Sequence, residues 1–232
     1  HKGGNTPIYV ELTTKAHQGR NHLMIMVNNT RMAERIPMQN IDWFNYGGIY
    51  REITLFSTPK DYIKDFFIYL EPNGNFNEIT LKIEYQGTPA QGLLEIAELG
   101  ITYSFAVDAA TTFLSINAKP KLWSPDSPKL YDVRLSIGQD QINDRVGFRE
   151  IKVVGNDIYL NGQAIFLNGI NVHEDDRKVG RLTNREDILL RYQHAKELGC
   201  NYLRLAHYPH HELAAQIADE VGLMLWEEIP VY

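Results

Sequence analysis

The chain has 232 residues, of which 44% are hydrophobic, and a formal net charge of −6 at pH 7. This length predicts two or three domains with apolar cores, and the acidic balance argues against a nucleic-acid partner, which would need a basic face. A single cysteine excludes a disulfide within one chain, and no apolar run reaches the roughly 18 residues of a transmembrane helix. His1 stands first, without a Met or an apolar leader, so we expect an excised piece whose targeting signal is out of view.

Residues 1–59 are predicted to form β structure. Apolar runs at residues 8–12 and 22–27 are strand-like and are separated by a turn that contains glycine. The following segment, residues 42–56, is rich in aromatic side chains and bends at Gly47-Gly48 before a further predicted strand. Composition alone favours a loop pinned by its aromatic side chains over a carbohydrate-contacting surface.

Residues 60–147 are predicted to form a second β unit. Turns such as Pro72-Asn73-Gly74 separate several short apolar strands at a spacing typical of a β-sandwich. Trp123 is expected in the core of this unit rather than on a ligand surface. The strands are predicted at residues 66–70, 78–85, 93–96, 102–107, 112–116 and 132–137.

Residues 148–232 are predicted to begin with a hairpin at 148–162 and to continue as alternating strands and helices. Asn184 is a predicted helix N-cap, with Asp187 three residues later, and Cys200 is expected to be a packed thiol. Strands are expected at 165–170, 201–206 and 223–229, and helices at 185–198 and 212–221. Three strands and two helices in this order fit the start of a TIM barrel.

Polar side chains follow the first two predicted barrel strands. Residues 171–176, Asn-Val-His-Glu-Asp-Asp, come after the first strand, and His207 comes after the second. Ligands bind at the C-terminal ends of barrel strands, so two histidines at equivalent ends favour a shared pocket over a solvated loop. His210 and His211 are expected to be exposed at the entry of the following helix.

Arg204 lies inside a predicted barrel strand, where a charge is costly unless it is paired. The carboxylates of Asp42 and Glu228 are its expected partners within this chain. An ion pair at this position favours a polar active-site floor over a plain apolar core. Glu227 is expected to serve packing or charge pairing.

The segment from 201 to 226 resembles the first signature of glycoside hydrolase family 2, the family of β-galactosidases, β-glucuronidases and β-mannosidases. Leu205 departs from the small residue that is usual there. The residues that fall in place are Asn201, Arg204, His207, Tyr208, Pro209, Asp219 and Gly222. Residues 1–7, 42–51, 122–131 and 169–174 are also similar to family segments.

The resemblance implies a multidomain fold of β and α/β parts. Residues 1–59 would be the C-terminal part of a sugar-binding jelly roll, and residues 60–147 an immunoglobulin-like β-sandwich. Residues 148–232 would be the incomplete start of a TIM-barrel catalytic domain. No cofactor is implied with certainty, although a divalent cation or Na⁺ in the parent enzyme stays open, and no metal ligand is assigned in this chain.

The resemblance further implies a parent enzyme that hydrolyses terminal β-glycosides with retention of configuration, with β-galactosides as the first expectation. β-Glucuronidase is the alternative within the family, because residues 42–51 and 173–175 are also close to that branch. A non-catalytic carbohydrate-binding module is the alternative from another class, and the strand-end histidines argue against it. The expected partner is a carbohydrate substrate. A homo-oligomer and the compartment, cytoplasmic or periplasmic, are left open.

Carried onto this sequence, the family's substrate-binding positions and their supporting residues form one set. The family's two glutamates, acid/base and nucleophile, are expected beyond Tyr232, so no catalytic residue is assigned here and the chain alone is expected to be inactive. The substrate-binding residues are Asp42, His173, Arg204 and His207. The supporting residues are Asn171, Glu174 and Glu228.

Overall fold

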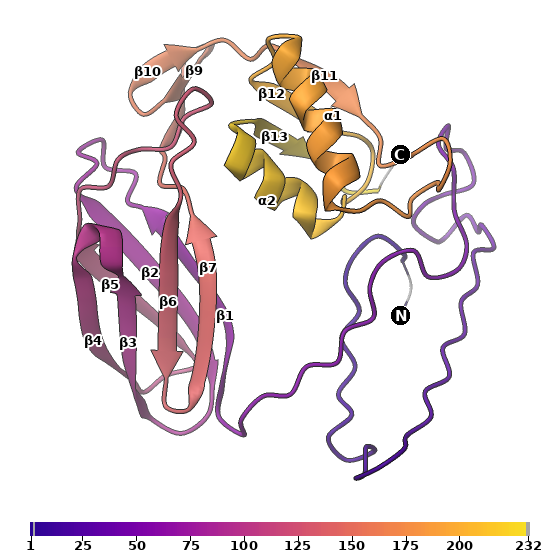
Figure 1. Cartoon of the computed structure of the whole chain (residues 1–232), viewed down its shortest axis with the longest axis horizontal. Helices are drawn as coiled ribbons and strands as arrows, with labels where there is room; N and C mark the ends of the chain where they lie inside the picture. Colours follow the sequence, from indigo (N-terminus) through magenta and orange to yellow (C-terminus); the bar gives the residue numbers. More distant parts are fainter. Residues whose placement is uncertain (2, 231–232) are drawn as a thin grey trace. The chain divides into compact units, whose positions relative to one another are not determined.

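The computed structural model describes residue 1 and residues 3–230 and is rich in β structure (Figure 1). The chain divides into two compact units. One comprises His1–Ile53, Gly169–Ile217 and Met224–Tyr232, and the other comprises Thr54–Asn168 and Ala218–Leu223. The proposed domain boundaries after residues 59 and 147 stay predictions.

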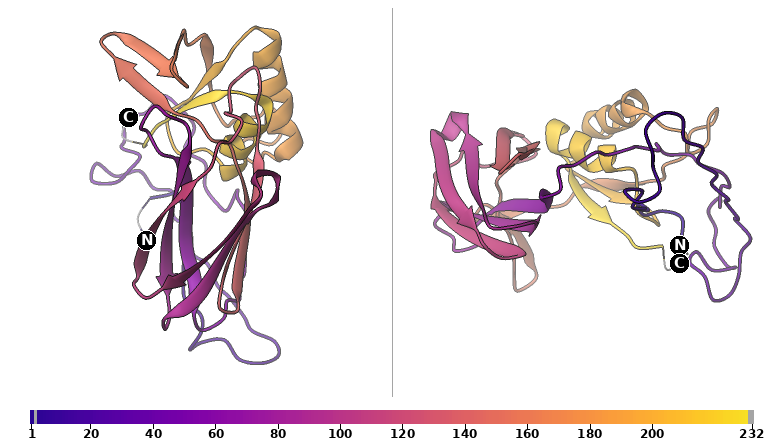
Figure 2. Two further views of the ribbon diagram at one scale, coloured as in Figure 1. Left: turned by 90° about the vertical axis from the view of Figure 1, so that its left-hand side faces the viewer. Right: turned by 90° about the horizontal axis from the view of Figure 1, so that it is seen from below.

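Two antiparallel sheets build the body of the second unit, and Figure 2 shows them as two layers. The first sheet has the order β1-β2-β5, from β1 (Tyr62–Leu70), β2 (Glu78–Gln86) and β5 (Thr111–Asn117). The second has the order β4-β3-β6-β7, from β3 (Ala90–Ile96), β4 (Ile101–Val107), β6 (Tyr131–Ile137) and β7 (Asp140–Val146). Every predicted strand of this region is present, whereas β7 and the short 3₁₀ helix η1 (Ala97–Leu99) were not predicted.

Alternate side chains of both sheets meet in one apolar core. Leu81 of β2, Leu94 of β3 and Leu135 of β6 have no exposed surface, as expected of the inward-facing positions of a half-buried strand. Trp123 is also fully buried, which confirms its predicted place in the core. Its indole Nε1 donates a hydrogen bond to the carbonyl of Asp219 at 2.8 Å, so the polar end of the ring is satisfied.

A three-stranded antiparallel sheet, β8 (Ile151–Val154), β9 (Asp157–Leu160) and β10 (Gln163–Ile165), contains the predicted hairpin. The prediction of a single strand at 165–170 is wrong. β10 ends at Ile165 and a separate strand, β11 (Gly169–Val172), follows and pairs in a different sheet. A Cβ on Gly169 would lie 2.3 Å from the carbonyl oxygen of Tyr202, so this close approach of β11 to its neighbour requires glycine.

The α/β part has a parallel sheet of order β11-β12-β13, with β12 (Tyr202–Leu205) and β13 (Met224–Glu227). Helices α1 (Arg185–Glu197) and α2 (Glu212–Val221) connect the strands, as predicted for the start of a TIM barrel. Asn184 and Asp187 form the predicted capping box at the start of α1. The thiol of Cys200 is buried, as expected.

The strands predicted within residues 1–59 are wrong. Among the described residues no strand precedes Tyr62, and Figure 1 draws this part as an irregular trace. A strand exists only where its backbone groups pair with a neighbouring strand. Residues 8–12 and 22–27, most of whose side chains are exposed, form no such ladder. Apolar alternation alone therefore overestimated the regular structure in this region.

Candidate functional site

The two strand-end histidines lie side by side. β11 and β12 are parallel neighbours with Val172 opposite Leu205, and each strand is followed closely by its histidine, His173 or His207. The two imidazole rings have their centroids 5.4 Å apart and are inclined by 72°. The prediction that they share one end of adjacent strands is confirmed.

An ion-pair cluster lies beside His207. Arg204, on β12, donates from Nε to Oε1 of Glu228 at 2.7 Å, and Nδ1 of His207 lies 3.0 Å from Oε2 of the same carboxylate. Arg204 Nη2 is 3.2 Å from His207 Nδ1. The predicted pairing of Arg204 with Glu228 is therefore present, and it explains how the strand accommodates a charge.

The electrostatic environment keeps Glu228 ionised. Burial by itself raises the pKa of this carboxyl, but the hydrogen bonds from Arg204 and His207, with their charges, outweigh burial and lower the pKa. An ionised carboxylate accepts hydrogen bonds and donates none. Glu228 thus orients its two partners from one fixed position after β13.

His173 is held in its neutral form. Burial, followed by the charge of His207, lowers the pKa of His173, whereas the carboxylates of Asp175 and Asp42 act in the opposite direction. The effect of Asp42 places its charge near His173, although the two residues are far apart in sequence. His173 Nδ1 lies 3.4 Å from the hydroxyl of Tyr208.

Glu174 forms a buried link beneath the histidines. Its side chain is 3% exposed and accepts hydrogen bonds from Arg51 Nη2 at 2.7 Å and from the backbone N–H of His211 at 2.6 Å. The same Arg51 nitrogen also donates to the carbonyl of Pro209 at 2.8 Å. Glu174 therefore joins the strand-end loop to residues 51 and 211. Asn171 is exposed and lies opposite Arg204 in the β11-β12 register.

Arg181 anchors the aromatic segment that carries Asp42. Its guanidinium carbon lies 3.6 Å from the ring centre of Tyr208 and 5.2 Å from that of Trp43, which are distances of cation–π contact. Arg181 also donates to Oδ1 of Asn5 at 2.9 Å and to the carbonyl of Phe44 at 3.2 Å. The expected loop pinned by its aromatic side chains is present, with a buried arginine at its centre.

The predicted exposure of His210 and His211 is wrong. His211 is 8% exposed, and its Nε2 lies 2.7 Å from a carboxylate oxygen of Glu52. The ring of His210 stacks on Tyr208 at 5.2 Å, and burial lowers the pKa of His210. Residues of the N-terminal segment, which a local helix pattern cannot reveal, pack against this helix entry.

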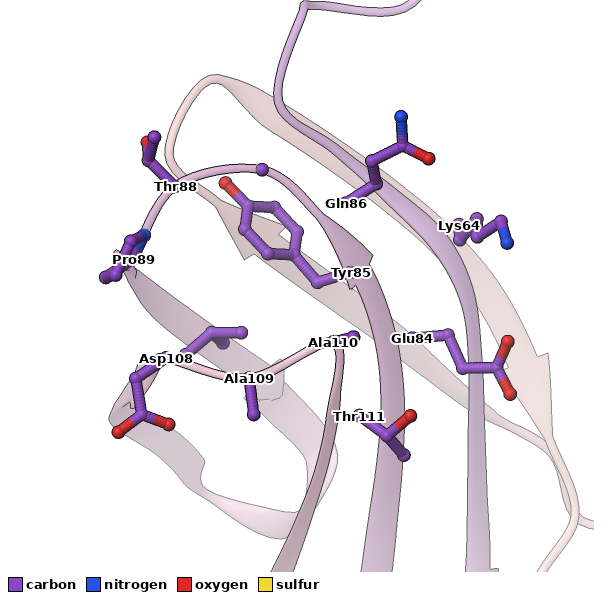
Figure 3. A pocket seen from close by; sticks show the side chains of 12 residues that line it. Lys64, Glu84, Tyr85, Gln86, Thr88, Pro89, Asp108, Ala109, Ala110 and Thr111 are labelled. Carbon is purple, nitrogen blue, oxygen red and sulfur yellow. The ribbon is translucent and has the colours of Figure 1, made fainter.

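A cavity of about 420 Å³ lies in the second unit, at one end of the sandwich (Figure 3). None of the predicted site residues lines it; its walls include Lys64, Tyr85 and the turn residues 87–89 and 108–110. Within the described residues no three His, Cys, Asp or Glu side chains gather in a way that could hold a metal ion. The strand-end cluster therefore remains the candidate site on chemical grounds.

Two family models match successive parts of the chain. The model described as "Glycosyl hydrolases family 2" matches residues 61–149, and "Glycosyl hydrolases family 2, TIM barrel domain" matches residues 151–232. The chain belongs to glycoside hydrolase family 2. The family match agrees with the parallel β11-β12-β13 sheet and with the signature between residues 201 and 226. Neither described α-helix has the length and apolarity needed to cross a membrane.

Relatives of this family 2 chain are named after two activities, β-glucuronidase and β-galactosidase. A putative β-glucuronidase of Formosa agariphila is 30% identical over 99% of this chain and 30% of its own length. A β-galactosidase of Halalkalibacterium halodurans is 27% identical over 97% of this chain and 24% of its own length. The apo structure of Bacteroides uniformis β-glucuronidase 3 matches with a TM-score of 0.76 and 30% identity, covering 88% of this chain and 27% of that chain. The family 2 chain thus spans less than a third of each of these proteins.

Sequence reasoning missed several residues that build the site. Arg51 and Arg181 join the N-terminal segment to the strand-end loops. Asn5 accepts from Arg181 at its side-chain oxygen, and its backbone carbonyl accepts from Arg51 Nη1 at 2.9 Å. The only local signal was the aromatic density of residues 42–50, which provides a surface on which a guanidinium can stack. The position of Arg181, more than a hundred residues from this segment, had no local signal.

Proposed function

We propose that this family 2 chain is part of a retaining glycosidase that hydrolyses terminal β-glycosides. The observation that carries the proposal is the pair of imidazoles, His173 and His207, held 5.4 Å apart at the ends of parallel strands. In a barrel enzyme these ends surround the active site. Imidazoles and carboxylates are suited to sugar hydroxyls, which both donate and accept hydrogen bonds.

Within this proposal the substrate is bound by Asp42, His173, Arg204 and His207. Glu228 supports Arg204 and His207 through its two oxygens, and Glu174 supports the strand-end loop from below. Asn171 is assigned a supporting role at the same strand end. The position of Asp42 depends on the loop that Arg181 anchors, so binding and loop order are coupled.

Hydrolysis with retention needs a nucleophilic carboxylate and an acid/base carboxyl about 5 Å apart. We assign neither role to Glu228, because its oxygens are engaged by Arg204 and His207 and its lowered pKa disfavours the protonated form that a general acid needs. Both glutamates are proposed to come from chain beyond Tyr232. This chain would then supply one wall of the substrate pocket.

The finer fold assignments belong to the same proposal. Residues 1–59 would be part of a sugar-binding jelly roll, residues 60–147 an immunoglobulin-like domain, and residues 148–232 the first part of the barrel. The two-layer antiparallel core supports the second assignment. The anchored aromatic segment around Trp43 supports a sugar-binding role for residues 1–59, because it brings N-terminal residues to the strand-end histidines.

β-Galactosides are the first substrates to test and β-glucuronides the second. β-Galactosidases among the relatives favour the former, and the names of the Formosa agariphila and Bacteroides uniformis proteins favour the latter. The test is release of nitrophenol from both nitrophenyl glycosides by the full-length enzyme, with the anomer of the first-formed sugar followed by NMR. Turnover with a β-configured first product supports the proposal. An inactive full-length protein that still binds sugars would favour the non-catalytic module instead.

A further inference from the structure

His211 stands immediately before α2 and caps that helix. Its Nδ1 accepts the backbone N–H of Leu213 at 3.1 Å. The N–H groups of a first helical turn have no acceptor within the helix, and a side chain that accepts one of them is an N-cap. Asn, Asp and Ser are the usual residues for this role. A histidine at this position therefore calls for a further reason.

The second ring nitrogen of His211 supplies that reason. A backbone N–H can only donate, so Nδ1 is an acceptor and the hydrogen of the ring lies on Nε2. Nε2 lies 2.7 Å from a carboxylate oxygen of Glu52 and donates to it. This hydrogen bond is the largest of the effects that lower the pKa of Glu52. An asparagine would cap α2 equally well, but its shorter side chain would not reach Glu52.

A closed ring of hydrogen bonds connects His211 to the N-terminal segment twice. Its backbone N–H donates to Oε1 of Glu174 at 2.6 Å, and Oε2 of Glu174 accepts from Arg51 at 2.7 Å. Arg51 is followed by Glu52, which returns to Nε2 of His211. Glu174 is buried, whereas the side chain of Glu52 is 67% exposed, so the Glu52 contact is the weaker arm of this ring.

The ring lies next to the candidate sugar site. Glu174 directly follows His173, so one member of the ring shares a loop with a site histidine. Asp42 precedes Arg51 on the N-terminal segment, and the charge of Asp42 acts on His173. Arg181 holds the start of this segment through the carbonyl of Phe44. The ring therefore fixes the other end of the segment that carries Asp42.

We propose that His211 is a positioning residue for sugar binding: its Nδ1 caps α2 while its Nε2 and backbone N–H hold residues 51 and 52, and through them Asp42, beside the strand-end site. The inference rests on the proposed function, because Asp42 is taken to bind the sugar. Loss of the Glu52 contact lowers the fraction of molecules in which Asp42 is in place. The apparent affinity for the sugar falls with that fraction.

His211→Asn in the full-length enzyme separates the two roles of the imidazole, because the amide keeps the helix cap but loses Glu52. We expect hydrogen exchange of peptides spanning residues 42–53 to become about two- to tenfold faster and KM for the hydrolysed nitrophenyl glycoside to rise about two- to tenfold, the effect of one hydrogen bond. The melting temperature and kcat should stay nearly unchanged. Wild-type exchange rates and KM in His211→Asn would overturn the proposal.

His211→Gln provides the reverse case. Its longer amide can donate to Glu52 but caps a helix poorly, so we expect a lower melting temperature with KM close to that of wild type. Glu52→Ala should reproduce His211→Asn, and the double variant should cost no more than either single variant, because both remove the same hydrogen bond. Glu34, which is exposed on the same segment, provides the control, since Glu34→Ala should leave KM and exchange unchanged.

A second cycle tests whether His211 acts through Asp42. In the Asp42→Asn enzyme, His211→Asn should no longer raise KM, because the group that it positions is already altered. A further rise in KM of the same size as in the wild-type background would show that His211 acts by another route and would overturn the proposal. Failure of the proposed function would appear differently, as wild-type enzyme without glycosidase activity, and the exchange measurement does not depend on turnover.

Discussion

Replacing Arg181 by methionine should release the aromatic segment that carries Asp42. The side chain of Arg181 is 2% exposed and its charge makes hydrogen bonds to Asn5 and to the carbonyl of Phe44. Methionine keeps much of the apolar stem but removes these bonds and the contact with the ring of Tyr208. The anchored state of residues 42–51 should therefore lose stability relative to an open state.

The magnitude follows from those contacts. Each hydrogen bond from a charged donor contributes about 1.5–3 kcal/mol, and a desolvated cation–π contact about 2 kcal/mol. Burying the guanidinium costs free energy of desolvation. Methionine avoids this cost, which offsets part of the stability lost with the contacts. We expect a net loss of about 3 kcal/mol, which corresponds to roughly hundredfold faster hydrogen exchange by local opening.

Hydrogen exchange of peptides spanning residues 42–51, read by mass spectrometry in the full-length enzyme, measures this effect. Arg177→Met is the matched control, because Arg177 is exposed on the same strand-end loop and should change local stability by less than about 0.5 kcal/mol. Exchange in Arg181→Met that matches wild type would refute the claim that Arg181 anchors the segment.

Asp42→Asn should lower kcat/KM about ten- to hundredfold while the melting temperature stays nearly constant, because the residue is exposed and its expected partner is the sugar; an unchanged kcat/KM would remove Asp42 from the site. The pKa of His173 is lowered from 6.5, so its contribution to stability is present above pH 6.5 and is lost as pH falls through the lower folded pKa. Between about pH 7.5 and pH 5 the melting temperature should thus fall less steeply for His173→Gln than for wild type. Equal slopes of melting temperature against pH would contradict the lowered pKa. Purified residues 1–232 should not release nitrophenol from β-galactoside or β-glucuronide, since three barrel strands cannot close a TIM barrel; turnover abolished by Glu228→Gln would make Glu228 catalytic.

The α/β part was predictable from the sequence because its signals are local. The capping box of Asn184 and Asp187, the apolar spacing of Ile188 and Tyr192, and the strand-end histidines all lie within short windows. Leu198 continues this apolar spacing but is 69% exposed, because it lies at the C-cap, where the helical face ends. Element boundaries depend on such terminal turns and are the least determined by periodicity.

The N-terminal segment was not predictable in the same way. Its apolar runs are compatible with strands, but a strand needs a partner, and the described residues 8–12 have none in a ladder. His211 is hydrogen-bonded to Glu52, and Trp43 is in cation–π contact with Arg181. Both contacts join residues more than a hundred positions apart, and the sequence signal for such pairs is absent from any local window.

The central claim is that the strand-end cluster binds the sugar of a β-glycoside. The most direct measurement is a crystal structure of the full-length enzyme with a lactam analogue of the glycone that it hydrolyses. The account predicts sugar hydroxyls within hydrogen-bond reach, about 2.6–3.2 Å, of His173, His207 and Asp42. A lactam bound in the active site with none of its hydroxyls near these three side chains would contradict it.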